Sequence, residues 1–504
     1  MSEARTLARI PVRATESPPT WAGSSRALAR RVVDEHDGGD GATHVAVRGV
    51  GGTGKTALLA ELARSYRAAG ITVVDAQGAP EPGDVTHPLA VLVDDAQRLT
   101  LRTTGRLRAL LQQPRVRLVL AYRPWPRPPA LLDLVEAMAG DRHLVVLNHL
   151  DRDAVRDCAE HRFGPLAPEL IDLVVHQTGG LPALVEPMLR ALAATRPQRV
   201  GGAPAHRATG TPSALTQAPA PVTERVLADL AELDECTRWA LHALAAGAPL
   251  DADVLADLVS VPSDEAVDLV QRAQATGAVL PSGKIVPVVR ATLLSSTPAD
   301  ATRAVRRRLF VLSLDRGEEP IELARTLATD RVRDPRVAQL LVAHADAAVT
   351  GDPALAGELL SEAADAGAPP ASLALRRALA AALAGDLDGA LQWADATLRD
   401  SSAPDHQQAA GVTAAVLAQR GLLHNTAQLY RVAGPDRAGS AALALLALGA
   451  RDEAETELAA AEEAARGWCP TSCPAASHSW PRESWSRSGR GRARRRQRRP
   501  RSPP

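Results

Sequence analysis

Thr43–Ala63 reads THVAVRGVGGTGKTALLAELA, and this stretch decides which fold we expect. Within it, Gly49–Thr56 fits the pattern G-x-x-x-x-G-K-[ST]. A β-like run comes directly before the pattern, and a helical, Ala- and Leu-rich segment follows it. Glycines let the backbone turn tightly and aim its N–H groups at an anion, which the N-terminus of the following helix also faces. The stretch therefore predicts a phosphate-binding loop between a strand and a helix.

The loop predicts a nucleotide site for ATP or ADP with Mg²⁺. Lys55 is expected to bridge the β- and γ-phosphates, and the Thr56 hydroxyl to bind the metal ion. The backbone of the remaining loop residues is expected to hold the phosphates: Gly49, Gly51, Gly52, Thr53 and Gly54. Lysine occurs elsewhere only at Lys284, so a chance match to the pattern has odds of about one in a thousand.

A second part of the site is predicted in LAVLVDDAQRL, about forty residues further on. Its apolar run ends at Asp94 and Asp95, and the carboxyl ends of parallel strands are where open α/β sheets bind ligands. Asp94 is expected to hold Mg²⁺, and Asp95 to orient or deprotonate an attacking water. The alternative is a helix-capping Asp pair. Arg123 follows another apolar run and is expected either to contact the γ-phosphate or to lie in a surface loop.

The pattern of apolar runs predicts an α/β fold. Short apolar runs alternate with helix-like segments, which indicates a parallel sheet that is buried on both faces. The runs are His44–Val47, Ile71–Asp75, Leu89–Val93, Arg117–Ala121 and His143–Leu147. The predicted P-loop ATPase domain spans 25–194, after a flexible N-terminus over 1–24.

The rest of the chain is expected to be mainly helical. A Pro-, Ala- and Gly-rich linker is predicted over 195–222, and a winged-helix-like domain over 223–300, with a small hairpin after three helices. Residues 301–466 are Ala- and Leu-rich, and Gly351 and Gly385 open similar segments 34 residues apart. That spacing predicts tetratricopeptide-like repeats, and the alternative is an irregular helical bundle.

Composition bounds the class of protein. The chain has 504 residues, of which 45% are hydrophobic and 23% charged, as in a soluble protein of about three domains. The sequence contains no uncharged apolar run of membrane-spanning length, and its first residues lack the apolar region of a secretory signal. Its four cysteines suit a reducing compartment. We therefore expect a cytoplasmic protein with no membrane partner.

The last residues, 467–504, differ from the rest of the chain. They contain ten Arg and one acidic residue, Glu483, without apolar periodicity, so a disordered tail is expected. Three interpretations are open: an arm that binds nucleic acid through phosphate charge, a solvated tail without a partner, and out-of-frame translation of a GC-rich gene. DNA binding through this tail would be non-specific.

The motifs GVGGTGKT, VLVDDAQRL, LVLAYRP and TGGLPALVE, in this order, resemble the STAND class of AAA-type signalling ATPases. More closely, they resemble the large ATP-binding LuxR-family transcriptional regulators. The resemblance implies an ATPase, a winged helix, tetratricopeptide-like helices and a C-terminal helix-turn-helix. It also implies that Arg123 is a sensor arginine and that Pro182 lies near the nucleotide base.

Two departures limit the resemblance. Val286 precedes Pro287 where such regulators carry a His-Pro pair that contacts ADP, and valine cannot donate a side-chain hydrogen bond. No helix-turn-helix pattern follows residue 466. We predict a nucleotide-dependent switch in transcriptional regulation, which is a weak ATPase and lacks its DNA-binding domain. Its helical repeats are expected to bind a protein partner or inducer, and nucleotide is expected to control its self-association. The alternative is a non-hydrolysing, nucleotide-dependent scaffold for partner proteins.

Overall fold

A five-stranded parallel sheet opens the described part of the chain, which in this computed structural model covers residues 44–138, 142–194 and 218–467. The strands are β1 His44–Gly49, β2 Thr72–Asp75, β3 Leu89–Val93, β4 Val116–Tyr122 and β5 Arg142–Leu147. Their order is β2-β3-β4-β1-β5, so β4 lies between β1 and β3. The α/β fold class and all five predicted strands are confirmed, with ends that shift by one or two residues.

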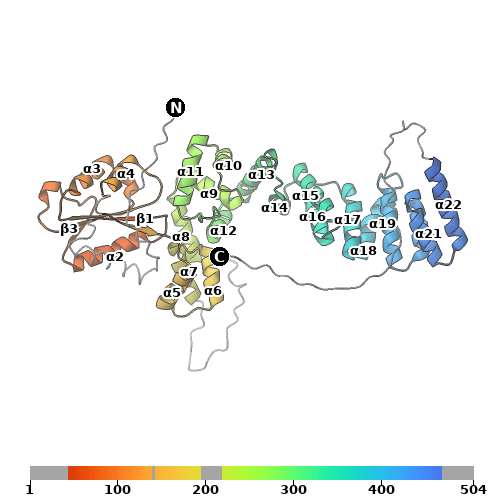
Figure 1. Ribbon diagram of the computed structural model, residues 1–504, viewed down its shortest axis with the longest axis horizontal. Coiled ribbons are helices and arrows are strands. Elements are labelled where there is room, and N and C mark those ends of the chain that lie inside the picture. The colour runs from red at the N-terminus through yellow and green to blue at the C-terminus, as the bar shows by residue number, and fades with distance from the viewer. Residues whose placement is uncertain (1–43, 139–141, 195–217, 468–504) are drawn as a thin grey trace, which may run out of the picture. The chain divides into compact units, whose positions relative to one another are not determined.

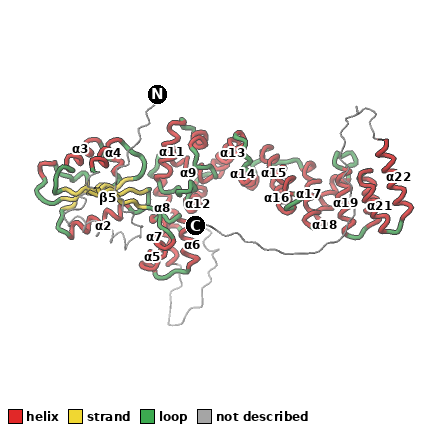
Figure 2. Tube along the Cα trace, in the orientation of Figure 1, coloured by secondary structure: helices red, strands yellow, loops and turns green. Residues whose placement is uncertain are grey.

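Helices cover both faces of the sheet (Figures 1 and 2). α2 (Lys55–Ala68) buries Leu58, Leu62 and Tyr66 against one face. α3 (Leu101–Leu110) and α4 (Pro129–Ala137) pack on the other face. α3 begins at Leu101 because the side chain of Thr100 accepts a hydrogen bond from the N–H of Thr103 and caps the helix.

Helices that follow the sheet share one apolar core. They are α5 (Arg152–Phe163), α6 (Pro168–Thr178), α7 (Pro182–Ala194), α8 (Ala220–Ala231), α9 (Glu235–Ala246), α10 (Ala252–Val259), α11 (Ser263–Ala275) and α12 (Pro287–Ser296). The predicted hairpin is a single antiparallel bridge between Val279 and Ile285. Two expectations were wrong in detail: α8 begins inside the predicted linker, and four helices, α8–α11, precede the bridge where three were predicted. Pro221 lies in the first turn of α8, where proline suits the start of a helix. α12 follows the bridge and begins at Pro287 in the same way.

The remaining described chain is helical: α13 (Ala299–Asp315), α14 (Ile321–Thr329), α15 (Pro335–Ala348), α16 (Pro353–Asp365), α17 (Pro370–Ala384), α18 (Leu387–Leu398), α19 (His406–Gln419), α20 (Leu423–Val432), α21 (Ala438–Ala447) and α22 (Arg451–Gly467). α16 and α18 begin 34 residues apart, at Pro353 and Leu387. α13 crosses the predicted boundary at residue 300, and Gly467 belongs to α22 rather than to the tail. The rest of the predicted tail and the predicted flexible N-terminus lie outside the described residues.

Contacts divide the chain into two compact units. The first consists of Met1–Ala347 with Glu358–Pro369, and the second of Ala348–Gly357 with Pro370–Pro504. The sheet, the phosphate loop and helices α2–α14 belong to the first unit. Among the described residues, none of the helices combines the length and the apolar character that a membrane span requires.

Candidate functional site

The predicted phosphate loop connects β1 directly to α2. Gly52 and Gly54 have φ values of 74° and 94°, a left-handed conformation that side chains other than glycine rarely adopt. The hydroxyl of Thr53 donates to the carbonyl oxygen of Val50 across the loop, at 2.9 Å. A Cβ on Gly49 would lie 2.5 Å from the Thr53 hydroxyl oxygen. The loop therefore needs its glycines at these positions.

Lys55 folds back into the loop that precedes it. Its Nζ donates hydrogen bonds to the carbonyl oxygens of Gly49, at 3.0 Å, and of Val50, at 2.8 Å. The side chain is buried, and burial together with the nearby Arg123 cation lowers the pKa of Lys55 to about 8, although Asp95 and Asp94 oppose this shift. A negative group in the loop would favour the charged ammonium, so Lys55 is placed to bind an anion.

Thr56 and Asp94 meet at the carboxyl edge of the sheet. The Thr56 hydroxyl donates to Oδ2 of Asp94 over 2.6 Å, although the two residues are 38 positions apart. Oδ1 of Asp94 accepts a hydrogen bond of 2.9 Å from the backbone N–H of Asp95. A hydroxyl and a carboxylate are oxygen ligands of the kind that Mg²⁺ prefers, so this pair fits the proposed metal ion.

Asp95, Gln97 and Arg123 form a small polar network beside the loop. Gln97 Nε2 donates to Asp95 Oδ1 at 2.9 Å, and its Oε1 accepts from the backbone N–H of Arg123 at 3.1 Å. Arg123 Nε lies 3.8 Å from Asp95 Oδ1, and it is buried without a hydrogen-bond partner among the described residues. Asp95 has a φ of 46°, which is uncommon for a residue with a side chain.

Gln97 is the member of this network that the sequence analysis missed. It is buried, at 7% exposure, in a short 3-10 helix (Ala96–Arg98) after the Asp pair. Its only sequence signal is its place in DDAQ, next to Asp94 and Asp95. A glutamine at that position is ordinary in a surface turn, so only the tertiary contacts with Asp95 and Arg123 identify it.

The phosphate loop also contacts the C-terminal end of α11. The N–H of Gly51 donates to the carbonyl oxygen of Ala275 at 2.8 Å. A Cβ on Gly51 would lie 2.2 Å from the carbonyl oxygen of Thr276, and a Cβ on Gly277 would lie 2.2 Å from that of Gly51. The two backbones approach so closely that neither glycine can gain a side chain without movement.

Pro182 lies beside the loop at the start of α7. It is buried, and the N–H of the next residue, Ala183, donates to the carbonyl oxygen of Gly52 at 3.0 Å. Val286, where a His-Pro pair was expected from the resemblance, is fully buried and packs toward Gly179. The structure thus brings Pro182 next to the loop and directs Val286 into the core.

A cavity of about 190 Å³ opens beside the loop. Gly51 and Gly52 line it, together with apolar side chains of α7 and α8. Three arginines from separate elements also line it: Arg98, Arg123 and Arg225. α8 adds Asp229, whose pKa is raised by burial, although its ion pair with Arg225 opposes this shift. Cations beside glycine N–H groups suit a phosphate-bearing ligand.

The parallel sheet, the glycine loop after β1 and the acidic end of β3 define an α/β P-loop NTPase fold. No family model matches the sequence. No curated protein matches it either.

Among solved structures, the chain is similar to a STAND protein with a tetratricopeptide repeat sensor from Pyrococcus horikoshii, at 14% identity and a TM-score of 0.24, over 92% of this chain and 80% of that one. It is similar to the RuvB Holliday junction branch migration motor of Thermotoga maritima, at 16% identity and a TM-score of 0.30, over 55% and 94%. It is also similar to the Aeropyrum pernix ORC1 protein in complex with DNA, at 15% identity and a TM-score of 0.31, over 55% and 93%. The fold assignment rests on the sheet and the loop themselves.

Proposed function

We propose that this protein is an ATP- and ADP-binding signalling NTPase of the LuxR-family regulator type, which acts as a nucleotide-dependent switch. Lys55 and the loop glycines would hold the phosphates, and Thr56 with Asp94 would hold Mg²⁺, which would neutralise phosphate charge. Arg123 would contact the γ-phosphate from the cavity wall. Pro182, buried beside Gly52, would lie near the base.

One observation supports a nucleotide-dependent switch: the hydrogen bond from the N–H of Gly51 to the carbonyl oxygen of Ala275. Backbone N–H groups of a phosphate loop are its main anion donors, and here one of them is engaged by the end of α11. A phosphate that takes the Gly51 N–H must displace the Ala275 carbonyl. A ligand that binds one arrangement better than the other shifts the population between them, so nucleotide and α11 would compete for the loop.

Hydrolysis would be slow in the arrangement described. Asp95 is the candidate to activate water, yet its carboxylate already accepts from Gln97 and faces Arg123. This engagement also favours the second candidate function, a non-hydrolysing scaffold that binds nucleotide and partner proteins. Steady-state phosphate release separates the two, because a switch that turns over requires measurable release that Lys55→Ala abolishes.

The decisive experiment compares the only two lysines of the chain. Lys55→Ala should weaken Mg-ATP and Mg-ADP binding at least a hundredfold in calorimetric titration. Lys284→Ala, at an exposed position in the turn before α12, removes the same charge and should bind like the wild type. Equal binding by the wild type and Lys55→Ala would refute the site.

The proposed partners follow from the remaining parts of the chain. The helical repeats would bind a protein partner or inducer, and nucleotide would control self-association. Any DNA contact would be non-specific, through the Arg-rich segment that lies outside the described residues. A shift assay at two salt concentrations tests this, because contacts to phosphates alone weaken steeply with salt.

A further inference from the structure

A groove lined by arginines lies between α13 and the turn that joins α14 to α15, away from the phosphate loop. Its volume is about 590 Å³, which is within the range of small-molecule sites. Four arginines and three apolar residues line it: Arg303, Arg307, Arg308, Arg333, Ala304, Val311 and Val332. We propose that this groove binds a small phosphate monoester, with the phosphate on Arg308 and Arg333 and the organic part on the valines.

Charge in the groove is only partly compensated. Arg303 pairs with Asp300 at 2.5 Å, and Arg307 pairs with the buried Asp334 at 3.1 Å. Arg308 and Arg333 have no carboxylate within salt-bridge distance among the described residues. Two free guanidinium groups match the two negative charges of a phosphate monoester, and each can donate two parallel hydrogen bonds to its oxygens.

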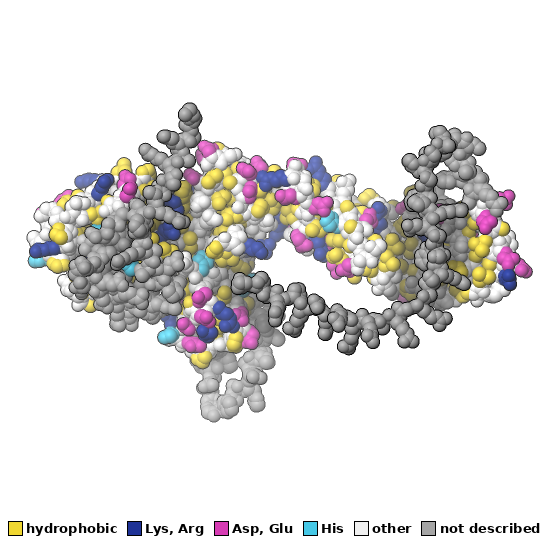
Figure 3. All heavy atoms as spheres, viewed as in Figure 1, with side chains coloured by type: hydrophobic (Ala, Val, Ile, Leu, Met, Phe, Trp, Pro, Cys, Tyr) yellow, Lys and Arg dark blue, Asp and Glu magenta, His cyan; other side chains and the backbone are white. Residues whose placement is uncertain are grey.

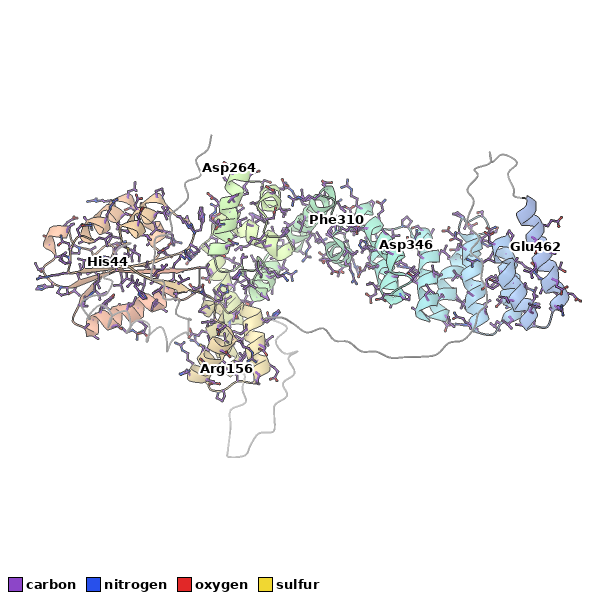
Figure 4. All side chains as sticks on the ribbon, viewed as in Figure 1. His44, Arg156, Asp264, Phe310, Asp346 and Glu462 are labelled. Atoms are coloured by element: carbon purple, nitrogen blue, oxygen red, sulfur yellow. The ribbon has the colours of Figure 1, made fainter. Side chains whose placement is uncertain are left out.

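Three of the groove's arginines come from one helix. Arg303 and Arg307 are four residues apart on α13, and Arg308 follows directly. Leu309 and Phe310 are buried and hold α13 in this orientation (Phe310 is labelled in Figure 4). Because Arg303 and Arg307 each pair with a carboxylate, Arg308 is the arginine of α13 whose charge a bound anion would neutralise.

The wall opposite α13 is held rigidly. The N–H of Asp334 donates to the carbonyl oxygen of Ala366 at 3.1 Å. The aliphatic part of Arg333 lies against Gly367, where a Cβ would come within 3.6 Å of it. Arg306 pairs with Asp330 at 2.6 Å and connects α13 to the same turn. The groove is therefore formed before any ligand binds, which lowers the entropic cost of binding.

A small ligand fits better than nucleic acid. A duplex that is bound through its backbone contacts about six to ten phosphates with Lys and Arg. Here two uncommitted arginines lie among ion pairs, and Figure 3 shows acidic and basic side chains interspersed on the face that it draws. α13 also contacts α9, whose Leu241 lines the cavity beside the phosphate loop.

The test uses the full chain with Lys55→Ala as background, so that the phosphate loop does not contribute to phosphate binding. The result then remains interpretable even if the proposed nucleotide site is wrong. Phenyl phosphate and inorganic phosphate are titrated by calorimetry at low salt. Phenyl phosphate should bind about tenfold more tightly than inorganic phosphate, because its ring adds apolar contact on the valines. Arg308→Gln and Arg333→Gln should each weaken both ligands at least tenfold.

Arg238→Gln is the matched control, since Arg238 is exposed on α9 without an ion pair among the described residues. It should leave binding unchanged, and thermal melting should be the same for all three variants because each replaced side chain is exposed. Unchanged phenyl phosphate binding in both Arg308→Gln and Arg333→Gln overturns the proposal. Tight binding of a duplex of about 20 bp that both variants abolish, without binding of phenyl phosphate, also overturns it and identifies a nucleic-acid surface.

Discussion

The backbone N–H of Gly51 donates a 2.8 Å hydrogen bond to the carbonyl oxygen of Ala275, 224 residues further along the chain. One partner belongs to the phosphate loop and the other ends α11. Gly277, two residues after Ala275, passes so close to Gly51 that a Cβ would lie 2.2 Å from the Gly51 oxygen. The loop that would bind nucleotide and the helix that would respond to it are therefore in direct backbone contact.

Replacing Gly277 should separate the phosphate loop from the C-terminal end of α11. Gly277→Ala adds a methyl group that must move the Gly51 carbonyl, so release of a fluorescent ADP analogue should be at least fivefold faster. Gly283→Ala is the control: Gly283 has a similar φ of 81°, but its added Cβ meets only Leu250, at 3.6 Å. Both variants carry the left-handed backbone cost of about 1 kcal/mol. Equal release rates in the two variants would show that the contact does not regulate the loop.

The two aspartates after β3 should have different roles. Asp94→Asn should weaken the dependence of ATP binding on Mg²⁺, because Asp94 accepts from Thr56 in the proposed metal site. Removal of Mg²⁺ with EDTA should weaken ATP binding by the wild type and change this variant little. Asp95→Asn should slow phosphate release while it leaves ATP affinity nearly intact. Unchanged turnover in both variants would mean that the pair only caps the following helix.

Gln97 is expected to act as a positioning residue. Gln97→Ala removes the partner of both Asp95 and the Arg123 N–H, so turnover should fall about ten- to a hundredfold through misplacement of these groups. The free energy of unfolding should fall by about 1 kcal/mol because two partly buried polar groups lose a partner. ATP affinity should change little. Gln112→Ala, at an exposed site, is the control and should behave like the wild type. If Gln97→Ala lost stability but kept its turnover, the role of Gln97 would be purely structural.

Nucleotide affinity should fall at high pH because the pKa of Lys55 is lowered to about 8. Nucleotide binding needs the charged ammonium of Lys55. This form is present in most molecules at pH 7 and in only about a tenth of them at pH 9, so ADP should bind about tenfold more weakly at pH 9. Binding near pH 8 should take up protons, which calorimetry in buffers of different ionisation enthalpy detects. Lys55→Arg keeps its charge, so its affinity should be nearly independent of pH over this range.

Local sequence determined the sheet and the loop. The apolar runs from His44 to Leu147 predicted all five strands. For β1, β3 and β4 the reason is that a strand buried on both faces must be apolar along its length. The spacing of Gly49, Gly54 and Lys55 predicted the loop, and its left-handed positions, Gly52 and Gly54, are glycines because residues with a side chain rarely adopt that conformation. The strands and the loop depend on residues that are close together in the chain, so both can be predicted from the local sequence.

Tertiary structure alone decided what surrounds the loop. Nothing in the local sequence indicates that the carbonyl of Ala275 meets the N–H of Gly51, that Gln97 joins Asp95 to Arg123, or that Arg308 and Arg333 line one groove. Each of these contacts depends on how helices pack across a shared core, and the packing angle is set by many side chains together. Every residue type except proline has a backbone N–H, so a backbone hydrogen bond such as that of Gly51 does not reveal its partner in the sequence.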